Sequence, residues 1–249
     1  MKRRNNINAD EKAPLDSGSI KSLIADLAAK DKDRRAKAHD ALIAASDSAT
    51  PVLVRALCDP RERVRWEVMK ILDEAKVDWK RHADEATVEA LVADLGSEDG
   101  LVRVRARKAL VTIGAKSVGA LEEALASRNE AKRWEAAKAL GQIGDSSAAG
   151  ALVRALEDED FDVRWLAAEG LVAIGERALA PLLRKVVERS NSEWVREGAH
   201  HVLHGITRGN VSGILRPVMS ALEDSEAPLQ VPIAAETALA KLAKSAARK

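Results

Sequence analysis

The chain has 249 residues and a formal net charge of +1, because 40 Lys and Arg face 39 Asp and Glu. This balance removes a bulk electrostatic pull toward nucleic acid or an anionic membrane. The longest stretch without Asp, Glu, Lys or Arg is ten residues, 198–207, whereas a membrane span needs about 20 apolar residues. The sequence therefore predicts a protein without a membrane partner.

Cysteine and aromatic residues are scarce. Cys58 is the only cysteine, which excludes an internal disulfide and is typical of a reducing cytoplasm. The basic N-terminus lacks the apolar run of a secretory signal. The aromatic residues are one Phe, five Trp and no Tyr, so the core must be aliphatic. Enrichment in Ala, Leu, Glu, Lys and Arg favours helices.

The chain divides into three predicted parts. Residues 1–18 are polar and are predicted to form a mobile tail, and residues 246–249 form a basic tail. A repeated motif fills residues 19–245, for example DFDVRWLAAEGLVAIG at 160–175 and NEAKRWEAAKALGQIG at 129–144. The repeats are centred on Arg35, Arg65, Arg103, Arg133, Arg164, Arg196 and a degenerate copy at Pro232.

Each repeat is predicted to form two short helices. Apolar residues recur in steps of three and four through every copy, which is the spacing of a helix with one apolar stripe. One helix pair cannot bury both stripes, but stacked pairs can. The sequence therefore predicts an all-α fold, an α-solenoid of about seven helix pairs.

Capping residues indicate the helix boundaries, taken in chain order. The predicted N-caps of the second helices are Asp31, Asp99, Asn129, Asp160 and Ser192, with Asp59 followed by Pro60 in the second repeat. Pro51 and Pro181 should lie in the first turns of first helices. Residues 76–84 are an insertion, and the second helices should end at Gly114, Gly144 and Gly175.

The first and last repeats are atypical. Arg34 and Ala36 replace the usual residues of the first repeat, and Pro228 and Pro232 interrupt the last one. Both are interpreted as caps of the solenoid. Capped ends favour a monomer over an open filament.

The motif D-x-x-V-R-x-x-A-A-x-x-L-x-x-I-G resembles the short HEAT repeat of the phycobilisome-lyase-type HEAT-like family. The matching residues are Asp160, Val163, Arg164, Ala167, Ala168, Leu171, Ile174 and Gly175. The resemblance covers roughly residues 19–245 and implies that the second helices line a concave groove. It also implies that the central Arg and the capping Asp form a structural ladder between repeats. A phosphate-binding Arg row is the alternative.

One position of the repeat carries tryptophan three times. Trp66, Trp134 and Trp165 each follow the central Arg directly, where other copies have Ala, Val or Glu. A tightly packed core position does not tolerate such changes in volume. This variation favours a partly exposed position facing the groove, and Trp is common at binding hot spots. Packing of each indole over the seam between helices is the alternative.

The charged neighbours of this position are mixed in sign. They are Glu67, Lys70, Arg105, Lys108, Glu135, Lys138 and Glu169. A groove for a polyanion would be uniformly basic. The pattern therefore favours a protein or peptide partner over nucleic acid, with the three Trp as anchors.

No residue grouping indicates catalysis or a cofactor. His200 and His204 lie one turn apart, a spacing that suits a metal, but no third ligand is evident, so structural histidines are favoured. Cys58 is expected to be a buried or half-buried thiol, not a nucleophile.

The predicted function is a non-enzymatic scaffold or adaptor that binds a protein or peptide in the groove. Two alternatives remain open. A nucleic-acid-binding, glycosylase-like protein could use the basic repeat around Arg103 and the C-terminal lysines. A bilin lyase-type subunit could hold a chromophore against the Trp residues.

Overall fold

The computed structural model describes residues 15–206 and 212–246, and the regular structure in these ranges is helical throughout. The described residues form two compact units, unit 1 up to residue 87 and unit 2 from residue 88 onward. No helix in these two described ranges is both long and apolar enough to cross a bilayer.

Unit 1 contains α1 (Ser17–Asp26), α2 (Lys32–Ala56), α3 (Glu62–Ala75) and the short 3-10 helix η1 (Lys80–His82). Helix α2 packs against both α1 and α3. It is continuous, whereas the sequence predicted a break before Pro51, which instead lies inside it. The first repeat has no glycine where Gly144 ends a later helix, so nothing terminates α2 there.

The insertion at 76–84 is part of the core of unit 1. Lys76 ends α3 in a left-handed conformation, with φ of 53°. The chain then turns into η1, which contacts α2. Trp79 directly precedes η1 and is only 5% exposed, so its indole anchors the insertion.

Unit 2 is a stack of helix pairs. Its second helices are α5 (Gly100–Ile113), α7 (Glu130–Ile143), α9 (Phe161–Ile174) and α11 (Glu193–Ile206). Its first helices are α4 (Glu85–Asp94), which begins at the boundary of the units, α6 (Val118–Ala124), α8 (Ala149–Ala155) and α10 (Leu179–Glu188). The 3-10 turns η2 (Gly114–Ser117), η3 (Ser146–Ala148) and η4 (Gly175–Ala178) lead into three of them.

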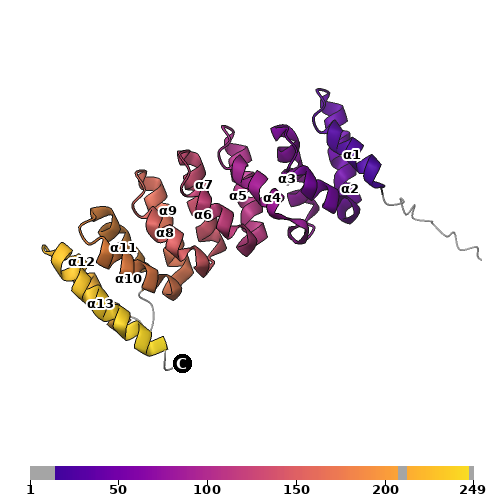
Figure 1. Cartoon of the computed structure of the whole chain (residues 1–249). Coiled ribbons are helices and arrows are strands. Elements are labelled where there is room, and N and C mark those ends of the chain that lie inside the picture. Colours follow the sequence, from indigo (N-terminus) through magenta and orange to yellow (C-terminus); the bar gives the residue numbers. More distant parts are fainter. Residues whose placement is uncertain (1–14, 207–211, 247–249) are drawn as a thin grey trace, which may run out of the picture. The chain divides into compact units, whose positions relative to one another are not determined.

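The second helices lie side by side in chain order, α5 on α7, α7 on α9 and α9 on α11 (Figure 1). Helices α7, α9 and α11 also pack on the first helices of their own pairs, α6, α8 and α10. This layering confirms the prediction of an all-α solenoid.

Most of the predicted helix caps are present. The side chains of Asp31, Asp99, Asn129 and Asp160 accept backbone N–H groups in the first turns of α2, α5, α7 and α9. The second repeat differs, because α3 begins at Glu62 and its N-cap is Arg61. Asp59 accepts the backbone N–H of Arg61 instead, so the predicted Asp59–Pro60 cap is wrong.

Helices α7 and α9 approach each other through glycine. A Cβ atom on Gly141 would lie 3.0 Å from the Cα atom of Gly170. Ala136 and Ala137, one turn before Gly141 on α7, are fully buried. Small residues therefore bring these two backbones together.

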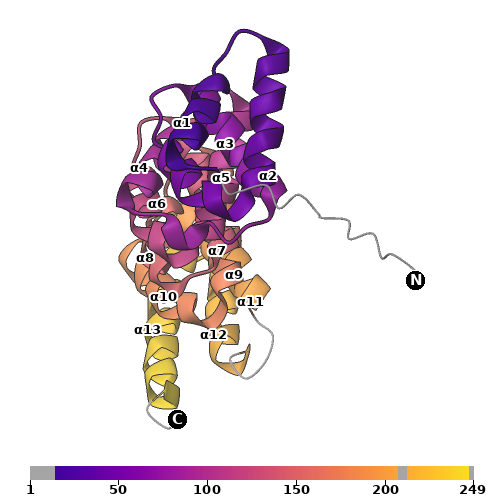
Figure 2. The same ribbon diagram turned by 90° about the vertical axis from the view of Figure 1, so that its right-hand side faces the viewer.

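The last helix pair departs from the order of the others. It consists of α12 (Ser212–Leu222) and α13 (Ala227–Ala246). Helix α13 packs against α10, in the layer of first helices, while α12 contacts α11 (Figure 2). Pro232 therefore does not continue the row of second helices as its repeat position predicted. Leu229 and Ile233 on α13 are 68% and 66% exposed.

Candidate functional site

The central arginines fasten the turn between the two helices of their own repeat. In each, Nη1 donates to the backbone carbonyl six residues earlier, at 2.6–3.0 Å. The arginines are Arg35, Arg65, Arg103, Arg133, Arg164 and Arg196. This role accounts for their recurrence without a phosphate ligand.

Among the described residues, the central Arg133 links its repeat to the next one through Asp158. Arg133 Nε and Nη2 donate to the two carboxylate oxygens of Asp158, at 2.9 and 3.1 Å. Asp158 precedes the capping Asp160 by two residues. The hydrogen bond to Asp158 raises the pKa of the Arg133 guanidinium, so this charge is permanent.

The three aligned tryptophans differ in exposure. Trp66 in unit 1 and Trp134 in unit 2 are half-buried, whereas Trp165 in unit 2 is 48% exposed. Lys138 Nζ lies 4.4 Å from the ring centroid of Trp134, and Lys70 Nζ lies 6.0 Å from that of Trp66. Trp165 has no lysine at the equivalent position, which Glu169 fills.

Trp165 belongs to an exposed aromatic cluster on α9 and α11, made up of Phe161, Trp165, Trp194 and His201. The ring centroids of Phe161 and Trp165 are 6.5 Å apart, and those of Trp165 and His201 are 4.5 Å apart. Phe161 is 61% exposed and Trp194 is 45% exposed. The chain has only six aromatic residues. It is unusual for several of them to be open to solvent, because large apolar side chains are normally mostly buried.

Arg164 holds the cluster together at the start of the two helices. Its guanidinium carbon lies 4.5 Å from the Trp194 ring centroid and 5.6 Å from that of Phe161. The same side chain donates to the carbonyls of Asp158 and Glu159. These hydrogen bonds fix the Arg164 guanidinium, and its contacts with the two rings hold the cluster in place without a ligand.

Phe161, Trp194 and His201 were not among the predicted site residues. Phe161 precedes Trp165 by one helical turn, a spacing that the sequence contains. Trp194 occupies a different repeat position, so register alone could not place it. It reaches the cluster because α11 stacks on α9.

Glu135 does not line a solvent-facing surface as predicted. It is 3% exposed and accepts a hydrogen bond from Arg107 Nε at 2.7 Å, which joins α5 to α7. Arg107 Nη1 also donates to Gln142 Oε1 at 2.7 Å. The buried guanidinium and carboxylate neutralise each other, so Glu135 serves packing between repeats.

The other predicted charged residues lie in varied surroundings. Lys108 and Glu169 are exposed, while Glu67 and Arg105 are half-buried. Glu169 Oε1 lies 2.5 Å from His201 Nε2, which ties this carboxylate to the aromatic cluster.

The other two histidines of α11 are His200 and His204. His200 Nε2 lies 3.1 Å from Glu223 Oε1, and the rings of His200 and His204 are 6.4 Å apart. The described residues hold no group of three or more ligands suited to a metal ion. Cys58 is exposed, so the expectation of a buried or half-buried thiol is wrong.

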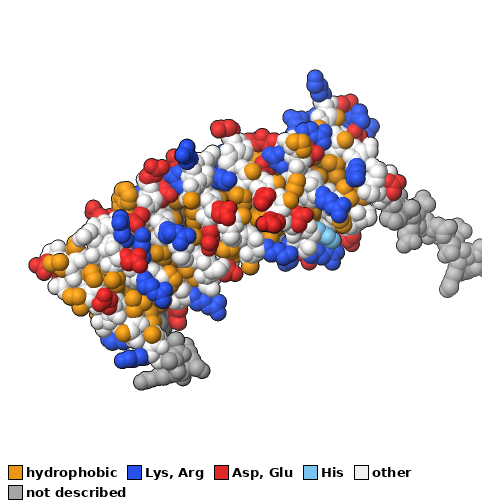
Figure 3. Space-filling model, in the orientation of Figure 1, with side chains coloured by type: hydrophobic (Ala, Val, Ile, Leu, Met, Phe, Trp, Pro, Cys, Tyr) orange, Lys and Arg blue, Asp and Glu red, His pale blue; other side chains and the backbone are white. Residues whose placement is uncertain are grey.

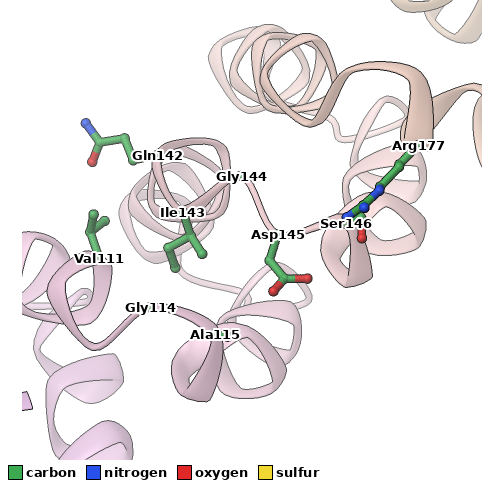
Figure 4. Close-up of a pocket in the computed structure, with 9 residues that line it drawn as sticks. All are labelled: Val111, Gly114, Ala115, Gln142, Ile143, Gly144, Asp145, Ser146 and Arg177. Atoms are coloured by element: carbon green, nitrogen blue, oxygen red, sulfur yellow. The ribbon is translucent and has the colours of Figure 1, made fainter. Parts of the chain in front are cut away.

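A pocket of about 480 Å³ opens among the loops that follow α5 and α7. Figure 4 shows the Arg177 side chain reaching toward Ser146 at its edge. Asp145 also lines it, but its carboxylate accepts the Ser147 backbone N–H and hydroxyl, at 2.9 and 2.8 Å. The Ser147 backbone hydrogen bond lowers the pKa of Asp145, and both hydrogen bonds from Ser147 go to Oδ1.

Acidic and basic side chains are interspersed over the face of the molecule in Figure 3. No broad single-sign area covers that face. This distribution agrees with the net charge of +1.

Comparison with curated proteins gave no match. Among solved structures, the chain is similar to an engineered protein, with 24% identity over 76% of this chain and 96% of that one and a TM-score of 0.46. It is similar to human deoxyhypusine hydroxylase in complex with glycerol, with 25% identity over 77% and 74% and a TM-score of 0.39.

A third similarity is to a structure of Kap95p bound to RanGDP, with 13% identity over 88% of this chain and 35% of that one and a TM-score of 0.49. Residues 118–204, from α6 to near the end of α11, match the family model for HEAT repeats, in agreement with the stacked helix pairs of unit 2.

Proposed function

We propose that the protein is a non-enzymatic scaffold that binds a protein or peptide partner on the second-helix face of unit 2, the exposed side of α5, α7, α9 and α11. The observation that carries this proposal is the exposed aromatic cluster on α9 and α11. Trp and other aromatic side chains supply much of the binding energy at protein interfaces. HEAT repeats, which residues 118–204 match, generally mediate protein binding.

The cluster suits binding for a physical reason. Phe161 and Trp165 lie one turn apart on a regular helix, so their spacing is fixed before binding. Ordering them on association therefore costs little conformational entropy. The surrounding Asp, Glu and Lys side chains form the polar rim that a protein interface needs.

The proposal includes the finer expectations from the sequence: a cytoplasmic location, a monomeric state and kinship with the phycobilisome-lyase-type HEAT-like proteins. Among the described residues, no specific observation favours attachment of a bilin or binding of nucleic acid.

The test is capture of partners by the immobilised protein, followed by mass spectrometry. We expect the double variant Trp134→Ala and Trp165→Ala to lose the partners captured by the unchanged protein, at equal helicity. Leu229→Ala is the matched control, because Leu229 is exposed on α13 and outside the cluster. Equal capture by the double variant and the control would refute the proposal.

A further inference from the structure

The charge of the second-helix face changes sign between α7 and α9. Apart from the buried Arg107, Arg133 and Glu135, helix α5 carries three basic residues and no acidic one, and α7 carries two basic residues and one acidic residue. Helices α9 and α11 each carry one basic and two acidic residues. One end of this face is therefore basic and the other end is acidic.

The change of sign is seen at one repeat position, four residues after the tryptophan. In α7, Lys138 follows Trp134 by four residues and its ammonium group lies against the indole ring. In α9, Glu169 follows Trp165 by four residues, so a carboxylate replaces the cation. The Trp134 ring already has its cation, whereas the exposed Trp165 ring is flanked by negative charge.

The exposed carboxylates around Trp165 come from both helices. Asp162 and Glu169 lie within one turn of Trp165 on α9, and Glu197 lies one turn before His201 on α11. Arg164 directly precedes Trp165, but it is engaged by two backbone carbonyls and by the rings of Phe161 and Trp194. His201 lies beside both the Trp165 ring and the Glu169 carboxylate. An aromatic face with carboxylates around it attracts an ammonium or guanidinium group.

The distance between the stacked helices sets the length of peptide that can span them. Neighbouring packed helices are about 8–10 Å apart. An extended peptide advances about 3.3–3.6 Å per residue, so about three of its residues cover the distance from one helix to the next. A segment of about 9–12 residues spans the four helices from α5 to α11.

We propose that this face binds an extended peptide segment whose one end is acidic and whose other end is basic. Acidic side chains of the partner contact Lys108 and Lys138, and a Lys or Arg side chain lies on Trp165 between Asp162 and Glu169. This inference rests on the proposed function and adds the chemistry of its partner.

The test uses the full chain and two labelled synthetic peptides of about 12 residues. One peptide has a glutamate-rich half and a lysine-rich half, and the other has the same composition with the charges alternating. Fluorescence anisotropy at about 50 mM salt should show at least tenfold tighter binding of the first peptide. The difference should shrink as salt is raised, because exposed charges are screened.

Two charge reversals locate the contacts. Glu169→Lys and Lys138→Glu should each weaken binding of the first peptide about three- to tenfold. Their matched controls are Glu188→Lys on α10 and Lys116→Glu in η2, which are exposed, lie off the second-helix face and should have no effect.

Equal affinity for the two peptides, or no binding of either, would overturn the inference. So would equal effects of the reversals and their controls. The proposed function fails separately, through unchanged partner capture by the Trp134→Ala and Trp165→Ala double variant. If the double variant loses partner capture but the two peptides bind with equal affinity, the scaffold function is retained. The proposal that the partner has one acidic and one basic end is then rejected.

Discussion

Arg107 and Glu135 form a buried ion pair between successive second helices, with Arg107 Nε 2.7 Å from Glu135 Oε2. Their side chains are only 9% and 4% exposed. Removing one partner from such a pair leaves the other charge buried and uncompensated. Breaking the pair should therefore lower the stability of the fold more than breaking any exposed ion pair of the chain.

Glu135→Ala should lower the free energy of unfolding by about 3 kcal/mol, measured by urea denaturation. The apolar double variant Arg107→Met and Glu135→Leu should recover most of this loss, because it removes both desolvated charges. Glu188→Ala is the exposed control and should change stability by less than about 0.5 kcal/mol. A loss in Glu135→Ala no larger than in the control would contradict a buried, coupled pair.

Gly141→Ala should destabilise unit 2 by about 1 kcal/mol, although alanine favours helix by about the same amount. The added Cβ would meet the Gly170 backbone at 3.0 Å, and overpacking costs about 1–3 kcal/mol. Gly119→Ala in α6 is the matched control, since a methyl group there would meet no atom of another element within 4 Å, and it should stabilise. Thermal unfolding of both variants tests the sign, and stabilisation by Gly141→Ala would show that the helices separate freely.

Trp79→Ala and Trp165→Ala should differ sharply in their effect on stability. Trp79 is 5% exposed, so its loss should cost about 3–5 kcal/mol in the unfolding of unit 1. Trp165 is 48% exposed, so its loss should cost less than about 1 kcal/mol. Denaturant unfolding followed by far-UV circular dichroism compares them, and similar costs would mean that Trp165 is a packing residue.

Glu157 should make stability depend on pH. Burial alone would raise the pKa of Glu157, but hydrogen bonds from Lys185 and Arg189 outweigh it and lower that pKa. A carboxyl group with a lowered folded-state pKa stabilises the fold above its unfolded pKa, about 4.3, and loses that contribution as the pH falls through the folded value.

The melting temperature of the unchanged protein should therefore exceed that of Glu157→Gln at pH 7. The difference should shrink progressively as the pH falls below the unfolded pKa of about 4.3 and through the lower folded value. Exposed Glu188→Gln should show no such difference at any pH. A gap between the unchanged protein and Glu157→Gln that does not shrink as the pH is lowered would mean that packing of Glu157, not its charge, supplies the stability.

The fold could be predicted from the sequence because its signals are local. Helical spacing, the N-caps Asp99, Asn129 and Asp160 and the terminating Gly144 all lie within one repeat. Where a local signal was missing, the prediction erred: α2 runs through Pro51 because no glycine ends it. The placement of α13 on α10 depends on contacts between distant segments, which no spacing records.

The candidate site was predictable only in part for the same reason. The repeat register singled out Trp165, and the structure leaves it half open to solvent. It could not assign Glu135 to a buried pair, because its partner Arg107 lies 28 residues away on another helix. Nor could it bring Trp194 to Phe161, since these two meet the same guanidinium only after α9 and α11 have stacked.

The central arginines have a consequence for how such a chain can grow. Each central arginine donates a hydrogen bond to the carbonyl six residues earlier, so the donor and the acceptor lie in one short stretch of sequence. A duplicated stretch would carry its own closed turn into the new position without requiring a matching change elsewhere. Lengthening or shortening the protein by one whole copy is thus a small evolutionary step, and the cost falls only on the surfaces where copies meet.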